Sequence, residues 1–571
     1  MTATFTIALA QIDPTVGDIA GNVALIRAAR AEAAKAKADL VVFPELSVVG
    51  YPPEDLIYRS AFLDAAQKAV NELAKDTADG GPALIVGAPW RGDGKDDGKT
   101  FNAALVLDGG AISAIRFKHH LPNYGVFDEK RVFDSGPAPG PVVVRGFRLG
   151  LMVCEDMWFE DIAETLVESG AEILIVPNGS PFDVEKPDVR LNHAVARVTE
   201  TLLPLIYVNQ VCGQDDLVFD GASFVLNADR SLAVQMASWT PELAITTWTR
   251  AADETLVCTK QNLTPPLSKM ESIYQALMLG LGDYVRKNKF PGVVLGLSGG
   301  IDSALAAAVA ADALGPDKVH CVMMPSPYTS QESLDDAEAV AKYLGVKLDT
   351  ISIGPAMAAY DTMLKDLFAG TQANITEENL QSRARGMALM ALSNKFGKMV
   401  LSTGNKSEMS TGYATLYGDM CGGYAVLKDV YKTTVFELCK WRNANKPQGA
   451  LGPAGKVMPE NVITKPPTAE LKPNQKDQDT LPPYEVLDAI LHGLIEDAAG
   501  VDAITARGFE AATVKRVYKM LKTAEYKRRQ APPGVKITHL AFGRDYRYPI
   551  TNGFQDDGHQ DTRLQENGVP R

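Results

Sequence analysis

Residues 293–314 read VVLGLSGGIDSALAAAVAADAL, and this stretch decides the fold of the C-terminal half. Val293 to Leu297 is a short apolar run that predicts a buried strand. Ser303 to Leu314 is rich in alanine and predicts a helix. The glycines between them let the backbone curl around an anion, and the free amides at the start of a helix attract negative charge. The stretch therefore predicts a strand, an anion-binding loop and a helix, in that order.

The same alternation of strand and helix continues toward the C-terminus. The segments predicted are strands at Val319 to Met324, Lys347 to Ile353 and Met399 to Ser402, and helices at Ser333 to Leu344 and Leu380 to Phe396. This rhythm predicts a doubly wound parallel sheet with its ligand at the carboxyl ends of the strands. Residues 446–484 are rich in Pro, Lys and Gly and predict a loop. That loop covers the active site, docks a neighbouring subunit, or does neither.

The first 250 residues alternate in the same way and predict a layered α/β sandwich with functional residues at strand ends. The segments predicted are a helix at Asn22 to Ala38 and strands at Thr4 to Ala10, Leu40 to Phe43, Ala83 to Gly87, Ala103 to Leu107, Leu149 to Val153, Ile173 to Val176 and Leu205 to Val208. Several are continuous Val, Ile and Leu runs, which is typical of strands covered on both faces. We therefore expect domains at 1–260 and 271–571, joined by a linker at 261–270.

Composition excludes several classes of protein. Lys and Arg total 57 against 70 Asp and Glu, which gives a net charge of −13 and argues against a nucleic-acid partner. No run of 18 apolar residues occurs, so no membrane-spanning helix is expected. The six cysteines form no CxxC pair and the seven histidines no HExxH motif, which argues against a disulfide framework and a histidine-bound metal. A reduced cytoplasmic setting is the simplest expectation.

Three residues near predicted strand ends are candidates for chemistry in the N-terminal half. Cys154 follows the strand Leu149 to Val153, Glu45 follows Leu40 to Phe43, and Lys118 follows the apolar run that ends at Ile115. Taken alone, such a cysteine is usually a small buried hydrophobe, and such charges usually lie at the surface.

The motifs around these residues change that interpretation. PELSVVGYPPEDL, KHHLPNYGVFDEKRVF and GLMVCEDMWF occur in this order, and residues 1–250 thereby resemble the nitrilase/amidase superfamily. The resemblance implies an α-β-β-α sandwich and a catalytic triad of Glu45, Lys118 and Cys154. Cys154 would attack a carboxamide to form a thioester, Glu45 would move the proton, and Lys118 would hold the oxyanion.

The same resemblance implies a pocket for glutamine, lined by Tyr124, Glu129, Ser180 and Lys186. One alternative is that Glu129 only forms an ion pair with its neighbours Lys130 or Arg131. Another is a Cys–His dyad that uses His119 or His120. The dyad is disfavoured because the Glu and Lys motifs already supply a base and an oxyanion partner.

The glycine loop of the C-terminal half carries the second site. It comprises Gly296, Leu297, Ser298, Gly299, Gly300, Ile301, Asp302 and Ser303. No GK[ST] follows, so it is not a Walker-type loop. It resembles the SGGxDS motif of the N-type ATP pyrophosphatases. The resemblance implies that the loop holds the pyrophosphate of ATP and that Asp302 binds Mg²⁺. The alternative is a glycine-rich turn in which Asp302 only caps a helix.

Four more motifs follow in order and narrow the family. They are ENLQSRARG at 378–386, LSTGNKSEMSTGY at 401–413, LYGDMCGGYAVLKDVYKT at 416–433 and AEYKRRQAPPG at 524–534. Nearly the whole chain thereby resembles the glutamine-dependent NAD synthetase family. The resemblance implies that Thr403 and Lys432 contact ATP, that Asn379, Glu408 and Lys527 contact deamido-NAD, and that Glu408 shares Mg²⁺ with Asp302. Taken alone, Lys432 and Lys527 are ordinary surface charges, and Glu408 is an acid in the first turn of a helix.

This family resemblance implies a complete reaction. Glutamine yields ammonia at the first site, and ammonia displaces AMP from an adenylated nicotinate at the second, along a shielded internal path. A homo-oligomer is also expected. The alternatives are another glutamine-dependent enzyme with the same ATP chemistry, acting on a nucleotide base or on aspartate, and an amidase with a nucleotide-sensing domain. A purely structural scaffold is disfavoured because both constellations are complete.

Overall fold

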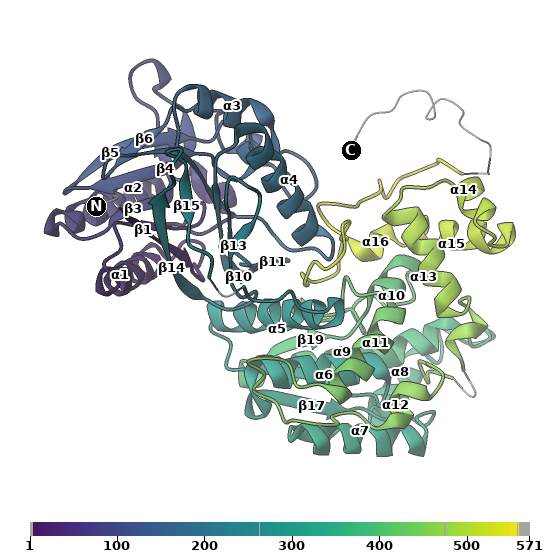
Figure 1. The fold of residues 1–571 in the computed structure, drawn as a ribbon. Helices are drawn as coiled ribbons and strands as arrows, with labels where there is room; N and C mark the ends of the chain where they lie inside the picture. The colour runs from purple at the N-terminus through teal and green to yellow at the C-terminus, as the bar shows by residue number, and fades with distance from the viewer. Residues whose placement is uncertain (1–3, 262, 473–474, 557, 559–571) are drawn as a thin grey trace. The chain divides into compact units, whose positions relative to one another are not determined.

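The computed structural model describes residues 4–261, 263–472, 475–556 and 558 (Figure 1). The chain forms two compact units, Met1–Lys269 and Met270–Arg571, and the division falls inside the predicted linker. Residue 262 of that linker, residues 473–474 of the predicted loop, and residues 557 and 559–571 of the predicted second domain lie outside the described residues. Residues 1–3 of the predicted first domain also lie outside them.

Unit 1 contains two large sheets and a hairpin. The seven-stranded sheet has the order β15 (Leu256–Cys258), β14 (Glu242–Arg250), β1 (Phe5–Gln11), β2 (Leu40–Val42), β3 (Ala83–Arg91), β4 (Thr100–Asp108) and β5 (Ala111–Phe117). The six-stranded sheet has the order β13 (Leu232–Gln235), β12 (Phe224–Leu226), β9 (Leu205–Asn209), β8 (Ile173–Asn178), β7 (Phe147–Leu151) and β6 (Val142–Val144). The hairpin pairs β10 (Val211–Gln214) with β11 (Leu217–Asp220).

The two large sheets pack face to face, with helices on their outer faces. Successive side chains of a strand point to opposite faces, so Ile7 and Leu9 lie in the core shared with strands of the other sheet. Ala8 lies instead in a second core with residues of α1 (Ile19–Lys35) and α2 (Ser60–Asp76). Helices α3 (Glu160–Glu168) and α4 (Lys186–Thr201) contribute a third core on the other sheet. The prediction of an α-β-β-α sandwich is confirmed, and burial on both faces explains the continuous apolar runs.

Several boundaries differ from the prediction. Helix α1 begins at Ile19 rather than Asn22, because the Asp18 side chain accepts a hydrogen bond from the Gly21 amide and caps the first turn. The antiparallel strands β6 and β10–β15 were not predicted. Strands β6, β12 and β15 have only three residues each, and β14 mixes apolar with polar residues instead of forming a continuous apolar run. Part of the predicted linker pairs with unit 1: the amides of Gln261 and Thr264 donate to carbonyls of β13.

Unit 2 is built on a five-stranded parallel sheet. Its order is β18 (Lys347–Thr350), β17 (Val319–Met323), β16 (Val293–Gly296), β19 (Met399–Ser402) and β20 (Tyr424–Ala425). Its longer helices are α5 (Lys269–Lys287), α6 (Ile301–Leu314), α7 (Gln331–Leu344), α8 (Gly354–Leu364), α9 (Ile375–Phe396), α11 (Lys432–Ala444), α13 (Tyr484–Ile495) and α15 (Ala511–Thr523). The shorter ones are α10 (Lys406–Thr411), α12 (Glu460–Thr464), α14 (Val501–Ala506) and α16 (Glu525–Arg528).

The strand order of unit 2 confirms the doubly wound sheet. From β16 the chain winds outward to β17 and β18, and then returns to add β19 and β20 on the other side. A crevice is expected where the order reverses, between the carboxyl ends of β16 and β19. Residues 446–484 are mostly loop as predicted, although Glu460–Thr464 forms the short helix α12. Among the described residues, no helix combines the length and apolar character needed to cross a membrane.

Candidate active sites

The first site lies at strand ends in unit 1. Glu45 follows β2, Lys118 directly follows β5, and Cys154 begins a 3-10 turn after β7. The Nζ atom of Lys118 lies 2.8 Å from Oε1 of Glu45, and both side chains are fully buried. The Cys154 thiol is buried beside them and interacts electrostatically with both. The structure therefore brings the three predicted residues together in one site closed to bulk water.

Glu45 is held by donors from two other segments. Its Oε1 accepts from the Asn102 amide at 2.7 Å, and its Oε2 accepts from the Gly179 backbone amide at 2.9 Å. A Cβ at position 179 would lie 2.9 Å from the Tyr51 ring, so only glycine allows this amide to approach. The carboxylate is therefore fixed in one orientation, as a positioned base requires.

Glu129 completes the surroundings of Lys118. Its Oε1 accepts from Lys118 Nζ and from the Tyr51 hydroxyl, each at 2.8 Å. The alternative ion pair with Arg131 is not formed, since that guanidinium binds Glu54, Asp55 and Asp128. Burial raises the pKa of Glu129. Burial alone would lower the pKa of Lys118, but the Glu129 and Glu45 carboxylates raise it well above its ordinary value.

Cys154 sits in a strained backbone conformation. Its φ of 49° is left-handed, which is uncommon for a residue with a side chain and is often found at functional sites. Burial raises the pKa of the Cys154 thiol well above its ordinary value, and the charge of Glu45 adds to this. The resting thiol is therefore protonated at neutral pH, so it needs a base to become a nucleophile.

The residues predicted to bind glutamine are each held by neighbouring side chains. The Tyr124 hydroxyl donates to both carboxylate oxygens of Glu155 at 3.0 Å. Ser180 is buried, and its hydroxyl accepts from Arg190 Nε at 3.0 Å. Lys186 begins α4, and its Nζ lies 4.4 Å from the centre of the Trp158 ring.

Sequence reasoning missed several residues of this site. Glu155 could have been singled out because it directly follows Cys154. Tyr51 lies inside the motif PELSVVGYPPEDL, which was recognised only as a whole. Asn102 carries no signal, because it lies inside an ordinary apolar strand.

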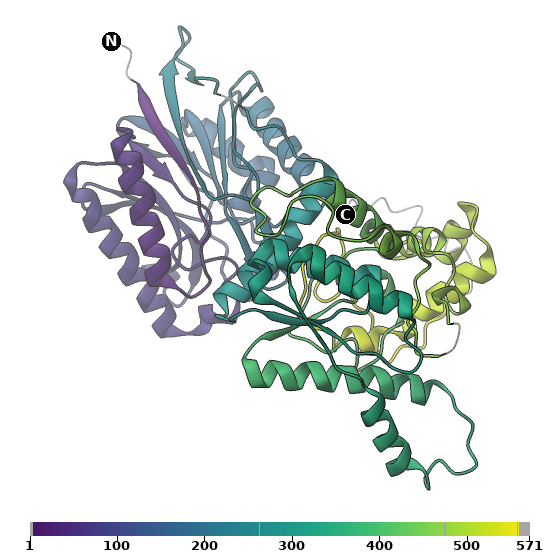
Figure 2. The same cartoon turned by 90° about the horizontal axis from the view of Figure 1, so that it is seen from below.

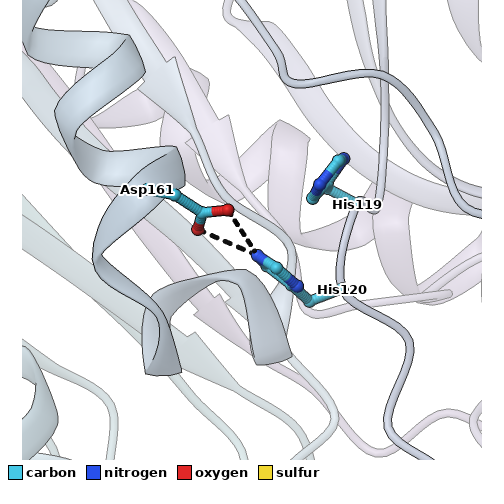
Figure 3. Close-up of side chains that lie close together, drawn as sticks. All are labelled: His119, His120 and Asp161. Carbon is cyan, nitrogen blue, oxygen red and sulfur yellow. Dashed lines mark hydrogen bonds and ion pairs between the residues drawn. The ribbon is translucent and has the colours of Figure 1, made fainter.

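The two adjacent histidines are engaged away from the nucleophile. His120 Nε2 lies 2.9 and 3.1 Å from the two carboxylate oxygens of Asp161, on α3. His119 Nδ1 lies 2.7 Å from the Gly136 carbonyl oxygen. Figure 3 shows His120 directed at Asp161, while His119 stands beside the pair without a bond to either. This arrangement gives no support to a Cys–His dyad.

The second site lies at the reversal point of the sheet in unit 2. Residues 296–303 lead from the end of β16 into α6, and Ser303 Oγ accepts from the Ser298 amide at 3.2 Å. Gly299 has a φ of 81°, and a Cβ there would lie 2.2 Å from the Ser333 carbonyl oxygen. Only glycine therefore fits where the loop packs against α7.

A cavity of about 300 Å³ opens at this loop. The predicted residues that line it are Gly296, Leu297, Ser298, Gly300, Ile301, Asp302, Ser303, Thr403, Glu408 and Lys432. The loop therefore faces the cavity, and Thr403 and Lys432 enter it from the ends of other elements.

Two carboxylates and one lysine form the charged centre of this cavity. Lys432 Nζ forms an ion pair with Asp302 and lies 3.8 Å from Glu408 Oε1. Asp302 Oδ1 also accepts from the Asn405 amide at 3.0 Å. Burial and the charge of Asp302 raise the pKa of Glu408. Burial alone would lower the pKa of Lys432, but Asp302 and Glu408 raise it. Two close carboxylates offer the oxygen ligands that Mg²⁺ prefers, so this donor set fits the predicted metal.

Two predicted residues are not part of the cavity lining. Lys527 Nζ donates to the carbonyl oxygens of Gly412 and Ala414 at 2.7 and 2.6 Å. Asn379 accepts a hydrogen bond from the Thr415 hydroxyl at 3.0 Å. Neither lines the cavity, although Ala414 does.

The loop of residues 446–484 supplies a wall that sequence reasoning did not assign. Its residues 465–471 and Asp477 line the cavity. Glu470 Oε1 accepts from the hydroxyls of Ser330 and Ser333 at 2.7 and 2.9 Å, which fixes the loop to α7. Of the three alternatives left open for this loop, the structure therefore supports covering the site. The loop pattern could not reveal this, because composition does not say what a loop packs against.

Comparisons with known proteins agree with both halves. A family model described as carbon-nitrogen hydrolase matches residues 6–253, and one described as NAD synthase matches residues 273–531. The glutamine-dependent NAD(+) synthetase of Rhodobacter capsulatus is 51% identical over 97% of this chain and 100% of its own. That of Acinetobacter baylyi is 45% identical over 97% of this chain and 99% of its own.

Solved structures give the same result. A glutamine-dependent NAD+ synthetase from Acinetobacter baumannii, in complex with ADP, is 43% identical over 97% of this chain and 100% of its own, with a TM-score of 0.77. One from Cytophaga hutchinsonii, 21% identical over 96% of this chain and 98% of its own, shares the fold with a TM-score of 0.80. Since relatives of this identity match over nearly their full length, the chain belongs to the glutamine-dependent NAD(+) synthetases and is a carbon–nitrogen ligase.

Proposed function

We propose that the chain makes NAD from deamido-NAD, ATP and glutamine, with the glutaminase in unit 1 and the synthetase in unit 2. The observation that carries this proposal is the buried group of Glu45, Lys118 and Cys154. A buried base, cation and thiol are the groups that amide hydrolysis needs, and the same chain carries an anion-binding loop that faces a cavity.

The glutaminase step begins with proton transfer. Glu45 takes the proton of the Cys154 thiol, and the sulfur attacks the carboxamide carbon of glutamine. Lys118 faces the oxygen that gains negative charge. Glu45 then returns the proton to the leaving nitrogen, which departs as ammonia and leaves a thioester. Water activated by Glu45 attacks the thioester and releases glutamate and the free thiol.

The rest of the pocket holds the two charged groups at the amino-acid end of glutamine. Lys186 binds the α-carboxylate, together with Ser180. Glu155, oriented by Tyr124, accepts the α-ammonium. Glu129 also accepts a hydrogen bond from Lys118, so it holds the ammonium in place while Glu45 acts as the base. A neutral amide such as acetamide lacks these charged groups, so it should react far more slowly.

The synthetase step joins two anionic substrates. The nicotinate carboxylate of deamido-NAD attacks the α-phosphorus of ATP, and pyrophosphate leaves into the loop of residues 296–303. Ammonia then attacks the adenylated carboxyl carbon, and AMP departs. Thr403 and Lys432 contact ATP, and Asn379, Glu408 and Lys527 contact deamido-NAD. Mg²⁺, held by Asp302 and Glu408, would offset the charge of the transferred phosphate.

One assay separates this function from its alternatives. The intact chain should form NAD from deamido-NAD and ATP with either glutamine or ammonium, releasing one pyrophosphate per NAD. Cys154→Ala should lose synthesis from glutamine by at least 1,000-fold and keep synthesis from ammonium. Loss of both activities would argue against separate sites. Pyrophosphate release with aspartate or a nucleotide base instead would favour another amidotransferase, and no release at all would favour a nucleotide sensor.

We also propose that a second copy of the chain docks on α8 and α9 of unit 2. No residue of α8 is buried, and Met363, Leu367, Ile375 and Met387 are each more than 60% exposed. Figure 2 shows α8 and the turn toward α9, in teal-green, projecting from their unit. Leu367→Glu should lower the mass measured by light scattering, whereas Val143→Glu, at an exposed apolar site in unit 1, should not. An unchanged mass for both variants would refute this docking site. The cytoplasmic setting and the internal ammonia path stay predictions.

A further inference from the structure

The short turn that carries the nucleophile also carries a tryptophan, Trp158, beside Lys186. Cys154–Trp158 is a single 3-10 turn, so the two residues are fixed relative to one another by four peptide bonds. Glu155, Asp156 and Met157 are buried and anchor the turn, while Trp158 is only partly buried. Trp158 has no role in the reaction derived above, which raises the question of what its ring does.

Lys186 is the residue that the Trp158 ring meets. Its Nζ lies 4.4 Å from the ring centre, well inside the range of cation–π attraction. Among the described residues, the ammonium forms no ion pair with any carboxylate and donates no side-chain hydrogen bond. Burial and the neighbouring Arg190 lower the pKa of Lys186. The carboxylates of Asp183 and Glu155 act on this ammonium only at longer range, without an ion pair. The ammonium is thus partly desolvated, and its donors are still available to a substrate anion.

A second residue of α4 supports the ring. The His193 imidazole lies 4.2 Å from the Trp158 ring centre, and it stands seven residues after Lys186 on the same face of the helix. Burial and the charges of Arg197 and Lys186 lower the pKa of His193. A neutral imidazole packs against the indole and does not compete with Lys186 for the ring.

We propose that Trp158 is a positioning residue that holds the Lys186 ammonium, through its ring face, at the place of the glutamine α-carboxylate. A carboxylate in that role would compete with the substrate for Lys186, whereas an aromatic face attracts the ammonium and leaves its donors free. The turn of Cys154–Trp158 thereby fixes the distance between the nucleophile and the cation that recognises the substrate. This inference rests on the proposed role of Lys186 in binding glutamine.

The experiment compares Trp158→Leu and Trp158→Phe in the intact chain. Trp158→Leu should raise the KM for glutamine about tenfold, equivalent to about 1.4 kcal/mol, with a much smaller change in kcat. Trp158→Phe restores a ring face and should recover most of that loss. Synthesis from ammonium should stay at the level of the unchanged chain in both variants, and the nearly unchanged kcat for glutamine shows that unit 1 is folded. A fall in kcat at constant KM, or a Phe variant no better than Leu, would overturn the proposal.

A double-mutant cycle separates this inference from the function on which it rests. In a Lys186→Met background, Trp158→Leu should have no further effect on the KM for glutamine. If Lys186→Met alone leaves that KM unchanged, the assignment of Lys186 to glutamine is wrong. If Lys186→Met raises the KM but Trp158→Leu does not, only the positioning role of Trp158 is wrong. Additive effects would likewise refute a role that acts through Lys186.

Discussion

The Asp156 carboxylate connects the turn that begins with Cys154 to the segment that follows Lys118. We predict that Asp156→Asn weakens this connection. Its Oδ1 accepts from the backbone amides of His119 and His120 at 3.0 and 2.8 Å, directly after Lys118. Its Oδ2 accepts from the amide of Val153 at 3.0 Å, directly before Cys154. One buried carboxylate therefore joins two segments that come from different sheets of unit 1.

The magnitude follows from counting these bonds. Asparagine keeps the oxygen that serves the two histidine amides, but places an NH₂ group opposite the Val153 amide. Two buried donors then lack an acceptor, at about 1–3 kcal/mol each. We expect Asp156→Asn to lower the free energy of unfolding of unit 1 by about 2–6 kcal/mol. A misplaced Cys154 should also lower glutaminase kcat about 10- to 100-fold.

The prediction includes a dependence on pH. Burial raises the pKa of Asp156 to about 6, from an ordinary value of 3.8. The folded state therefore binds this proton more tightly than the unfolded state. The stabilising contribution is complete below pH 3.8 and is lost as the pH rises through 6. Between pH 5 and pH 7 the free energy of unfolding should fall by about 1 kcal/mol more in the native chain than in Asp156→Asn.

Denaturant unfolding at several pH values, with glutaminase and ammonium-driven assays on the same samples, tests these expectations. Asp161→Asn is the matched control, because Asp161 is an exposed acid whose partner is His120. It should change the free energy of unfolding by less than about 1 kcal/mol. An Asp156→Asn variant with unchanged stability and glutaminase activity would refute the tie. Equal loss of the ammonium-driven activity would show that the damage is not confined to unit 1.

Two further predictions concern unit 2. Asp302→Ala should abolish AMP formation, measured by chromatography of the nucleotides, and leave some glutaminase activity; normal AMP formation would mean that the assigned role is wrong. Gly299→Ala should destabilise the loop by more than about 2 kcal/mol and raise the KM for ATP. The φ of Gly299 is 81°, and the Cβ of an alanine there would clash with a backbone carbonyl of α7. Gly345→Ala has a φ of 69° but open space around it, so it should cost only about 1 kcal/mol and leave the KM for ATP unchanged. Equal losses of stability in Gly299→Ala and Gly345→Ala would show that the clash with α7 does not matter.

The sequence predicted the sheets well where burial was complete. Strands such as β8 and β16 are covered on both faces, so their apolar runs are continuous and readable. The hairpin strands β12 and β13 are short and lie at or near a sheet edge, and their pattern did not distinguish them from loops. Helix starts were misplaced by two or more residues because capping residues such as Asp18 and Ser330 lie before the periodic pattern begins.

The candidate sites could be predicted only where residues stand in motifs. Cys154, Lys118 and Glu45 were found because each sits in a recognisable segment near a strand end. Asn102 escaped because its contact with Glu45 joins residues 57 positions apart and leaves no local trace. Glu470 escaped for the same reason, since its partners on α7 lie 137 and 140 positions away. Contacts between segments far apart in the sequence are properties of the fold, not of any one segment.

Both sites share one electrostatic arrangement. In unit 1, Lys118 lies between Glu45 and Glu129, and in unit 2, Lys432 lies beside Asp302 and Glu408. Fully ionised, each group would carry one surplus negative charge. Burial raises the pKa of one acid in each group, Glu129 and Glu408, and so favours a proton there and less negative charge beside the lysine as long as no further cation is bound. A neutral site receives an anionic oxygen or phosphate with far less repulsion than a charged one. In unit 1 this leaves Lys118 free to meet a developing oxyanion. In unit 2 the binding of Mg²⁺ would displace the proton of Glu408, and the charge of the metal would then offset the two carboxylates. A chain with a net charge of −13 can in this way act on anionic substrates.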